Sequence, residues 1–244
     1  MTTWIAKRRK QKDRTMKKIM FNERFGLQQA VLDGTKTMTR RIIHDIEIDW
    51  NRSGRVTLPV GGFENGTLLM NVRSILSDAG INDYPAPAKY QPAYKMGEEI
   101  AIAQKYWDLR NCDAFYEALQ KADPTFPLEC IKDEAGCHNK MFVRADWMPH
   151  RIRIKSIKAE RLQSISNEDI YKEGFKKEAV NNGWGNAAWH WETMLTYMDN
   201  LGRYKQICSP KPQEAFACLI DKLSGYGTWE RNPWVYAYEF ELVR

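Results

Sequence analysis

Hydroxyl groups and cations gather in one short segment, Thr35-Lys36-Thr37-Met38-Thr39-Arg40-Arg41. Lys36 and Thr39 lie three residues apart across a predicted turn, so their side chains can share a pocket. A threonine hydroxyl is a poor nucleophile by itself, but a lysine whose pKa is lowered by burial can accept its proton. Arg40 or Arg41 can clamp a phosphate with two hydrogen bonds. The plainer interpretation is a solvated turn lysine beside a strand threonine, and both interpretations stay open.

Other groups that could do chemistry are scattered along the chain. The five cysteines are odd in number and irregularly spaced, which favours reduced thiols. Cys130, Cys137 and His138 are the one cluster that hints at zinc, but its spacing is looser than that of structural zinc sites. No nucleophile-elbow, phosphate-loop or dinucleotide motif is present. We therefore expect no metal and no cofactor.

Two further patterns allow contact with nucleic acid. The aromatic segment 183–191 contains Trp184, Trp189 and Trp191, whose rings can stack on an unpaired base or pack in a core. Arg151, Arg153 and Lys155 alternate along a predicted strand, so one strand face is cationic. That face is either solvated or turned toward phosphates.

Charge is unevenly distributed over the 244 residues. Residues 1–18 carry a net charge of +7, whereas the rest of the chain carries −1. We predict that residues 1–18 form a basic, disordered tail, either a solvated arm or an added attraction for phosphate backbones. No apolar run of transmembrane length and no secretory signal pattern is present, so we expect a cytoplasmic protein with no membrane partner.

Periodicity predicts short strands with few strong helices, which favours an α+β fold built on a small twisted sheet or barrel. Strands are predicted at 19–21, 100–107, 141–144, 150–157 and 234–243, with a hairpin formed by 55–60 and 67–75. Helices are predicted at 23–32, 114–121 and 213–223, with another that begins at Ser166. We expect residues 19–244 to form one domain with insertions near 44–95, 108–140 and 176–212.

Four segments, in order, resemble the ASCH domain family, and in particular its phage- and prophage-type members. They are Leu32 to Arg41, which matches a G-x-K-T-x-T-R-R turn; Tyr94 to Ile100; Val143 to Phe175, which includes Glu173-Gly174; and Trp229 to Val235. The resemblance implies a PUA-like, mixed or antiparallel small β-barrel with flanking helices. It also implies a partner that is RNA or a modified nucleoside or nucleotide.

One small bacterial branch of that family, which hydrolyses N4-acetylcytidine, is similar to this chain at its site. The similarity implies catalytic roles for Lys36, Thr39 and Glu173. Thr37, Arg40 and Arg41 are then expected to contact the ligand. Two functions follow from the resemblance: an RNA- or nucleotide-binding module, or an amidohydrolase that acts on acylated nucleosides. The sequence does not predict the oligomeric state.

Overall fold

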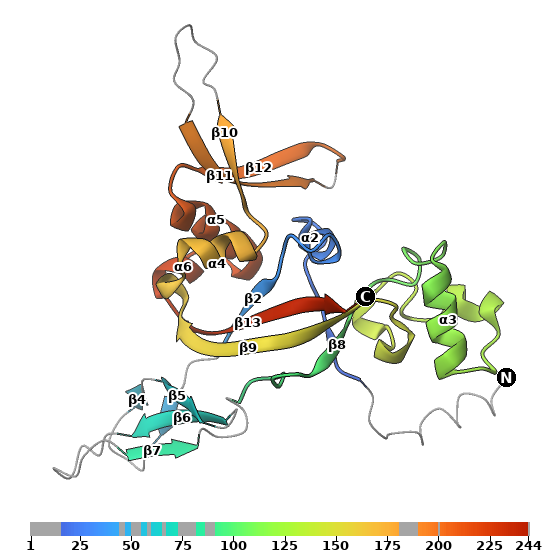
Figure 1. Cartoon of the computed structure of the whole chain (residues 1–244), viewed down its shortest axis with the longest axis horizontal. Helices are drawn as coiled ribbons and strands as arrows, with labels where there is room; N and C mark the ends of the chain where they lie inside the picture. The colour runs from blue at the N-terminus through green and yellow to red at the C-terminus, as the bar shows by residue number, and fades with distance from the viewer. Residues whose placement is uncertain are drawn as a thin grey trace, which may run out of the picture. The chain divides into compact units, whose positions relative to one another are not determined.

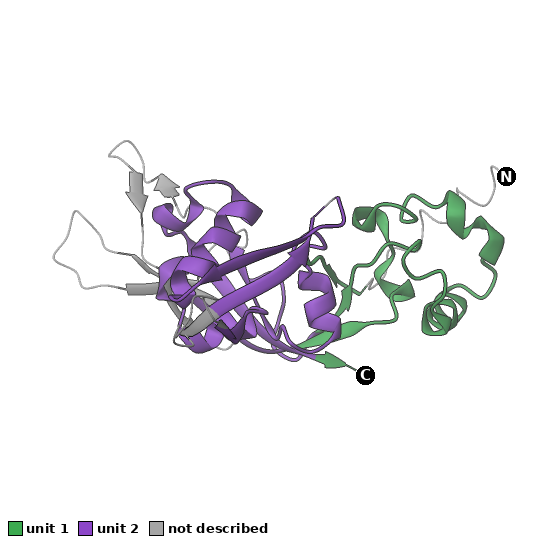
Figure 2. Cartoon of the chain, turned by 90° about the horizontal axis from the view of Figure 1, so that it is seen from above, with its two compact units in different colours: residues 1–21, 99–153, 242–244 green, residues 22–98, 154–241 purple. Residues whose placement is uncertain are grey.

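The computed structural model describes residues 16–43, 47–49, 55–57, 60–64, 67–72, 82–85, 91–180, 190–199 and 201–243 (Figure 1). The chain divides into two compact units, coloured separately in Figure 2. Unit 1 comprises residues 1–21, 99–153 and 242–244, and unit 2 comprises residues 22–98 and 154–241. Strands and helices occur in both units, so the predicted α+β class is confirmed.

The largest sheet has the strand order β1-β8-β9-β13-β2. Its strands are β1 (Lys18–Ile19), β2 (Met38–Ile42), β8 (Glu99–Ile102), β9 (Arg151–Arg161) and β13 (Trp234–Val243). In unit 2, β13 pairs with β2 in antiparallel register, with Tyr238 opposite Thr39 and Ala237 opposite Arg40. Since side chains alternate along a strand, Thr39 and Arg40 project from opposite faces of β2.

Four helices of unit 2 accompany these strands: α2 (Leu27–Leu32), α4 (Asn167–Lys172), α5 (Pro212–Ser224) and α6 (Thr228–Arg231). Figure 1 shows α4, α5 and α6 gathered beside the curved strands β9 and β13. As predicted, Ser166 marks the start of α4 as its N-cap: its hydroxyl accepts a hydrogen bond from the Asp169 backbone N–H at 3.1 Å. The helix expected from residue 23 begins four residues later, after a turn in which Asn22 accepts the Phe25 N–H.

A second sheet of unit 2 joins β10 (Lys176–Val180), β11 (His190–Met198) and β12 (Tyr204–Ser209) in that order. One face is buried: Leu195 and Ile207 are opposite each other, and Tyr197 contacts the Phe25 ring at 4.9 Å. The sequence pattern predicts no strand in this section, because its polar residues hide the alternation.

The backbone of five more strands lies in the section expected to be an insertion near 44–95. They are β3 (Glu47–Asp49), β4 (Arg55–Thr57), β5 (Val60–Glu64), β6 (Thr67–Val72) and β7 (Asn82–Pro85). β3 pairs with β4, and β6 pairs with both β5 and β7. The predicted hairpin is therefore correct for the second strand, but its first strand is β5 rather than residues 55–60.

Unit 1 packs around an aromatic core beside α3 (Asp113–Ala122), which confirms the helix predicted there. Tyr106 stacks on Phe115 at 5.5 Å, and the Trp147 ring lies 5.4 Å from Tyr106. Three 3₁₀ helices complete this unit: η2 (Leu128–Asp133), η3 (Lys140–Phe142) and η4 (Ala145–Trp147). The strand predicted at 141–144 is wrong, because Asn139 caps a 3₁₀ turn by accepting the Met141 N–H.

The described strands form open sheets, and no closed barrel is found among them. A fourth 3₁₀ helix of the described residues, η5 (Leu162–Ser164), follows β9. All five cysteines are free thiols, as expected. Among the helices of the described residues, none is long and apolar enough to cross a membrane.

Candidate functional site

A buried ion pair joins two of the predicted site residues, Lys36 and Glu173. The Lys36 side chain is only 2% exposed, and that of Glu173 is 6% exposed. Lys36 Nζ donates to Glu173 Oε2 at 2.5 Å and to the Glu173 backbone carbonyl at 3.0 Å. The two residues are 137 positions apart in the chain, so the tertiary fold alone brings them together.

Local structure fixes both partners of this pair. Lys36 ends the turn after α2, where its N–H donates to the Ala30 carbonyl. The Thr37 backbone joins the turn to α4 and β13. Its N–H donates to the Lys172 carbonyl, and its carbonyl accepts the Phe240 N–H, both at 2.8 Å. Glu173 is the C-terminal cap of α4. The ammonium therefore meets the negative end of a short helix as well as a carboxylate.

Burial dominates the electrostatics of Lys36. Removal from water lowers the pKa of this lysine, and the net shift is downward although Glu173 opposes it. Arg41 and Arg40 also lower the Lys36 pKa, so the ammonium lies within electrostatic range of both guanidinium groups. A lysine with a lowered pKa deprotonates more readily, which is the property required of a proton acceptor.

Arg40 extends the pair into a closed network with a buried guanidinium, whose side chain is 1% exposed. Its Nη1 donates to Glu173 Oε1 at 3.0 Å, and its Nη2 donates to Asp169 Oδ2 at 2.9 Å. Both Nε and Nη2 donate to Glu160 Oε1, at 3.0 and 2.7 Å. Lys158 closes the network with a 2.6 Å hydrogen bond to Asp169 and a 3.3 Å ion pair with Glu160. Three cations thus face three carboxylates.

Burial alone would lower the Arg40 pKa, but Glu173 and Glu160 outweigh it and raise the pKa. Burial likewise opposes ionisation of Asp169, yet Lys158 and Arg40 hold the Asp169 pKa below its ordinary value of 3.8. Both groups are therefore ionised at neutral pH.

Acid is expected to destabilise unit 2 through Asp169. Because its pKa is lowered in the folded state, its stabilising contribution is complete above the ordinary value of 3.8 and is lost as the pH falls through the folded-state pKa. Urea unfolding measured from about pH 6 down to about pH 2 tests this. As the pH is lowered, the free energy of unfolding should fall less steeply in Asp169→Asn than in the wild type. The matched variant of an exposed aspartate, Asp133→Asn, should keep the wild-type slope.

Gly174 shapes the wall beside Lys36. It has φ +105°, which only glycine adopts readily, and a Cβ there would lie 3.5 Å from the Lys36 Cβ and 3.6 Å from the Ala30 Cβ. We expect Gly174→Ala to cost about 1–3 kcal/mol of stability through backbone strain. Gly202→Ala is the matched control, since Gly202 also has a positive φ, +73°, but nothing lies near its added Cβ. Only Gly174→Ala should also change the NMR signals of Lys36; equal effects on Lys36 would contradict this account.

A second group of predicted residues, Thr39 and Arg41, projects from the other face of β2. Thr39 is buried, and its strand partner Tyr238 contacts the Tyr94 ring edge-on at 5.3 Å. Tyr238 accepts the Ala93 N–H at 3.1 Å, and burial raises the Tyr238 pKa to about 12. Arg41 is exposed and close enough to lower the pKa values of both tyrosines. This face therefore combines tyrosine rings with an exposed cation.

The predicted site residues thus divide between two faces. Lys36, Arg40 and Glu173 converge, whereas Thr39 and Arg41 lie on the opposite face, and within the described residues no hydrogen bond joins the Thr39 hydroxyl to Lys36 or Glu173. Arg40 was expected to contact a ligand, but its donors point at three carboxylates. The aromatic segment 183–191 lies outside the described residues, apart from the backbone of its last two residues.

Sequence reasoning missed three members of the network: Lys158, Glu160 and Asp169. Their spacing contained a usable pattern. Lys158 and Glu160 are two residues apart on β9 and share a face, and Asp169 precedes Glu173 by one helical turn. Across the described residues, no group of three or more histidine, cysteine or acidic side chains could hold a metal ion.

Comparison with known proteins gives no relative from which to transfer a function. The chain matches no protein-family model, no curated protein and no solved structure. A functional assignment therefore depends on the site geometry described above.

Proposed function

We propose that unit 2 is a PUA-like domain of the ASCH type that binds RNA or a modified nucleoside or nucleotide beside the segment 36–41. The observation that carries this proposal is the difference between the two arginines. Arg40 is buried and neutralised by carboxylates, whereas Arg41 is exposed beside the Tyr94 and Tyr238 rings.

The chemistry of this face suits a nucleotide. A guanidinium binds phosphate oxygens or a base edge through paired hydrogen bonds, and aromatic rings stack on unpaired bases. Tyr238 is 1% exposed and supports the face from below, whereas the half-buried Tyr94 is the ring that a base can reach.

Binding of a short single-stranded RNA and of cytidine 5′-monophosphate, measured by calorimetry, tests this proposal. Loss of Arg41 in Arg41→Ala removes a charged hydrogen-bond donor, and we expect affinity to fall by about 10-fold or more. Arg203→Ala is the matched control, because the Arg203 side chain is 61% exposed and pairs with Asp199 away from the segment 36–41. Equal losses in the two variants, or no binding by the wild type, would contradict the proposal.

The buried pair favours a second candidate function, hydrolysis of an acylated nucleoside such as N4-acetylcytidine. Lys36, with its lowered pKa, would accept the proton of the Thr39 hydroxyl as the hydroxyl oxygen attacks the acetyl carbon. The C–N bond then breaks, and the protonated lysine returns its proton to the leaving cytidine nitrogen. One water molecule hydrolyses the acyl-threonine ester and releases acetate.

Glu173 has a defined task in this scheme. Its carboxylate stabilises the ammonium form of Lys36 that exists between the two proton transfers. The scheme requires the Thr39 side chain and the Lys36 amine to approach each other when a substrate binds, since no hydrogen bond joins these two described residues.

A further inference from the structure

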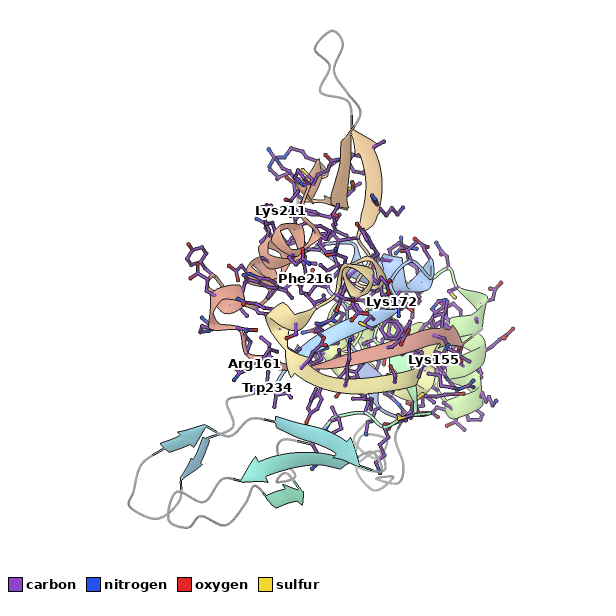
Figure 3. All side chains as sticks on the ribbon, turned by 60° about the vertical axis from the view of Figure 1, so that its left-hand side comes forward. Lys155, Arg161, Lys172, Lys211, Phe216 and Trp234 are labelled. Atoms are coloured by element: carbon purple, nitrogen blue, oxygen red, sulfur yellow. The ribbon has the colours of Figure 1, made fainter. Side chains whose placement is uncertain are left out.

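The Arg40 guanidinium is held on every side. Its edges donate to Glu160, Asp169 and Glu173, and Nη1 also points at the Met38 sulfur at 3.4 Å. Its carbon lies 5.9 Å from the centre of the Phe216 ring of α5. Figure 3 shows Phe216 on the helix that lies over the strands of this unit. This saturation leaves Arg40 no donor for a ligand, so its function must act through its protein partners.

We infer that Arg40 is a positioning residue, which orients the Glu173 carboxylate so that one oxygen faces Arg40 and the other faces Lys36. This inference deepens the proposed function of the Lys36–Glu173 pair and rests on it. The geometry supports it directly, because Oε1 accepts from Arg40 at 3.0 Å while Oε2 accepts from Lys36 at 2.5 Å. A carboxylate held at both oxygens cannot rotate without breaking one of the two contacts.

The rest of the network fixes Arg40 in turn. Glu160 and Lys158 come from β9, and Asp169 comes from α4, one helical turn before Glu173. Asp169 and Glu173 therefore present two carboxylates from one helix face to the same guanidinium. A planar fork with several donors can hold this arrangement, whereas the single ammonium of a lysine cannot. The inference thus predicts that charge alone, without the fork, fails to orient Glu173.

The test uses the titration of Lys36 itself, followed by NMR with an isotopic label at the lysine Cε. The charged groups that act on Lys36 are Glu173, which raises its pKa, and Arg40 and Arg41, which lower it. Removing a repulsive cation by Arg40→Gln would by itself raise the Lys36 pKa. Loss of Glu173 orientation would instead lower it, by about 1 pH unit. The two explanations therefore predict opposite signs.

We expect the Lys36 pKa to fall in Arg40→Gln and also in Arg40→Lys, which keeps the charge but loses the fork. Glu160→Gln, a milder change at a partly exposed carboxylate, should also lower the Lys36 pKa, but by a smaller amount. Arg161→Gln, at an arginine that lies over Trp234, is the control and should leave Lys36 unchanged. A rise in Arg40→Gln, or a wild-type value in Arg40→Lys, would overturn the inference.

Failure of this inference is distinguishable from failure of the proposed function. The Lys36 titration needs no ligand and no turnover, so it reports on Arg40 even in a protein that binds no nucleotide. Conversely, a protein that binds or hydrolyses its ligand but shows a raised Lys36 pKa in Arg40→Gln would retain the proposed function and lose the positioning role.

Discussion

Glu173→Ala is expected to destabilise the protein by about 3–5 kcal/mol, because it removes one partner of a buried ion pair. Lys36 is 2% exposed and would be left as an uncompensated buried charge, and Arg40 would lose one of its three carboxylates. Urea unfolding at neutral pH measures the loss. Glu178→Ala is the matched control, since Glu178 is an exposed glutamate in the next strand, and surface changes of this kind cost less than about 0.5 kcal/mol.

A double substitution tests the physical cause. In Lys36→Met/Glu173→Leu both charges are replaced by apolar groups, and such replacements of buried pairs are often nearly neutral. We therefore expect the double variant to be more stable than Glu173→Ala. The matching single variants are Lys36→Met and Glu173→Leu. If the double variant loses as much unfolding free energy as these two single variants together, the residues contribute independently, which would contradict the pairing seen here.

The proposed hydrolysis of N4-acetylcytidine predicts that Lys36→Met lowers kcat/KM by about 10²- to 10⁴-fold, the usual contribution of a positioned proton acceptor. Methionine keeps most of the length of the buried side chain while removing the amine, and the Glu173 carboxylate keeps its contact with Arg40, so we expect a smaller loss of stability than in Glu173→Ala. Cytidine release, separated by chromatography, gives the rate.

Lys176→Met is the control for this experiment, because Lys176 is an exposed lysine of β10 in the same unit. It should retain the wild-type rate. If the wild type hydrolyses the substrate and Lys36→Met does so at the same rate, Lys36 is not the proton acceptor.

The elements that sequence patterns predicted well share strong, local features. The strand Trp234–Val243 alternates clearly, and α5 combines an apolar stripe with a proline at its start, so both were located within a residue or two. The sheet of β10, β11 and β12 was missed because its buried face itself contains polar residues, such as the cross-strand partners Thr193 and Ser209. The supposed strand at 141–144 failed because an asparagine cap overrode a short apolar run.

The site shows the same limit of sequence reasoning. The resemblance led to Lys36 and Glu173, and the structure brings these two residues together. The resemblance did not lead to the network around Arg40. Local spacing shows which carboxylates share a strand or helix face, but it does not show that Arg40, more than 100 positions away, pairs with them. Strand alternation alone would have separated Arg40 from Thr39 and Arg41, once β2 was known to run from Met38 to Ile42.

The central claim is that a nucleobase-containing ligand binds beside the segment 36–41, and one titration tests it most directly. N4-acetylcytidine, cytidine 5′-monophosphate and a short RNA would each be added to the isotope-labelled full chain while its backbone NMR signals are recorded. Binding at this site predicts shifts centred on Thr37 to Arg41 and on Tyr94, with cytidine release in the same sample if the amide is hydrolysed. Shifts confined to other parts of the chain, or none with any of the three ligands, would contradict the claim.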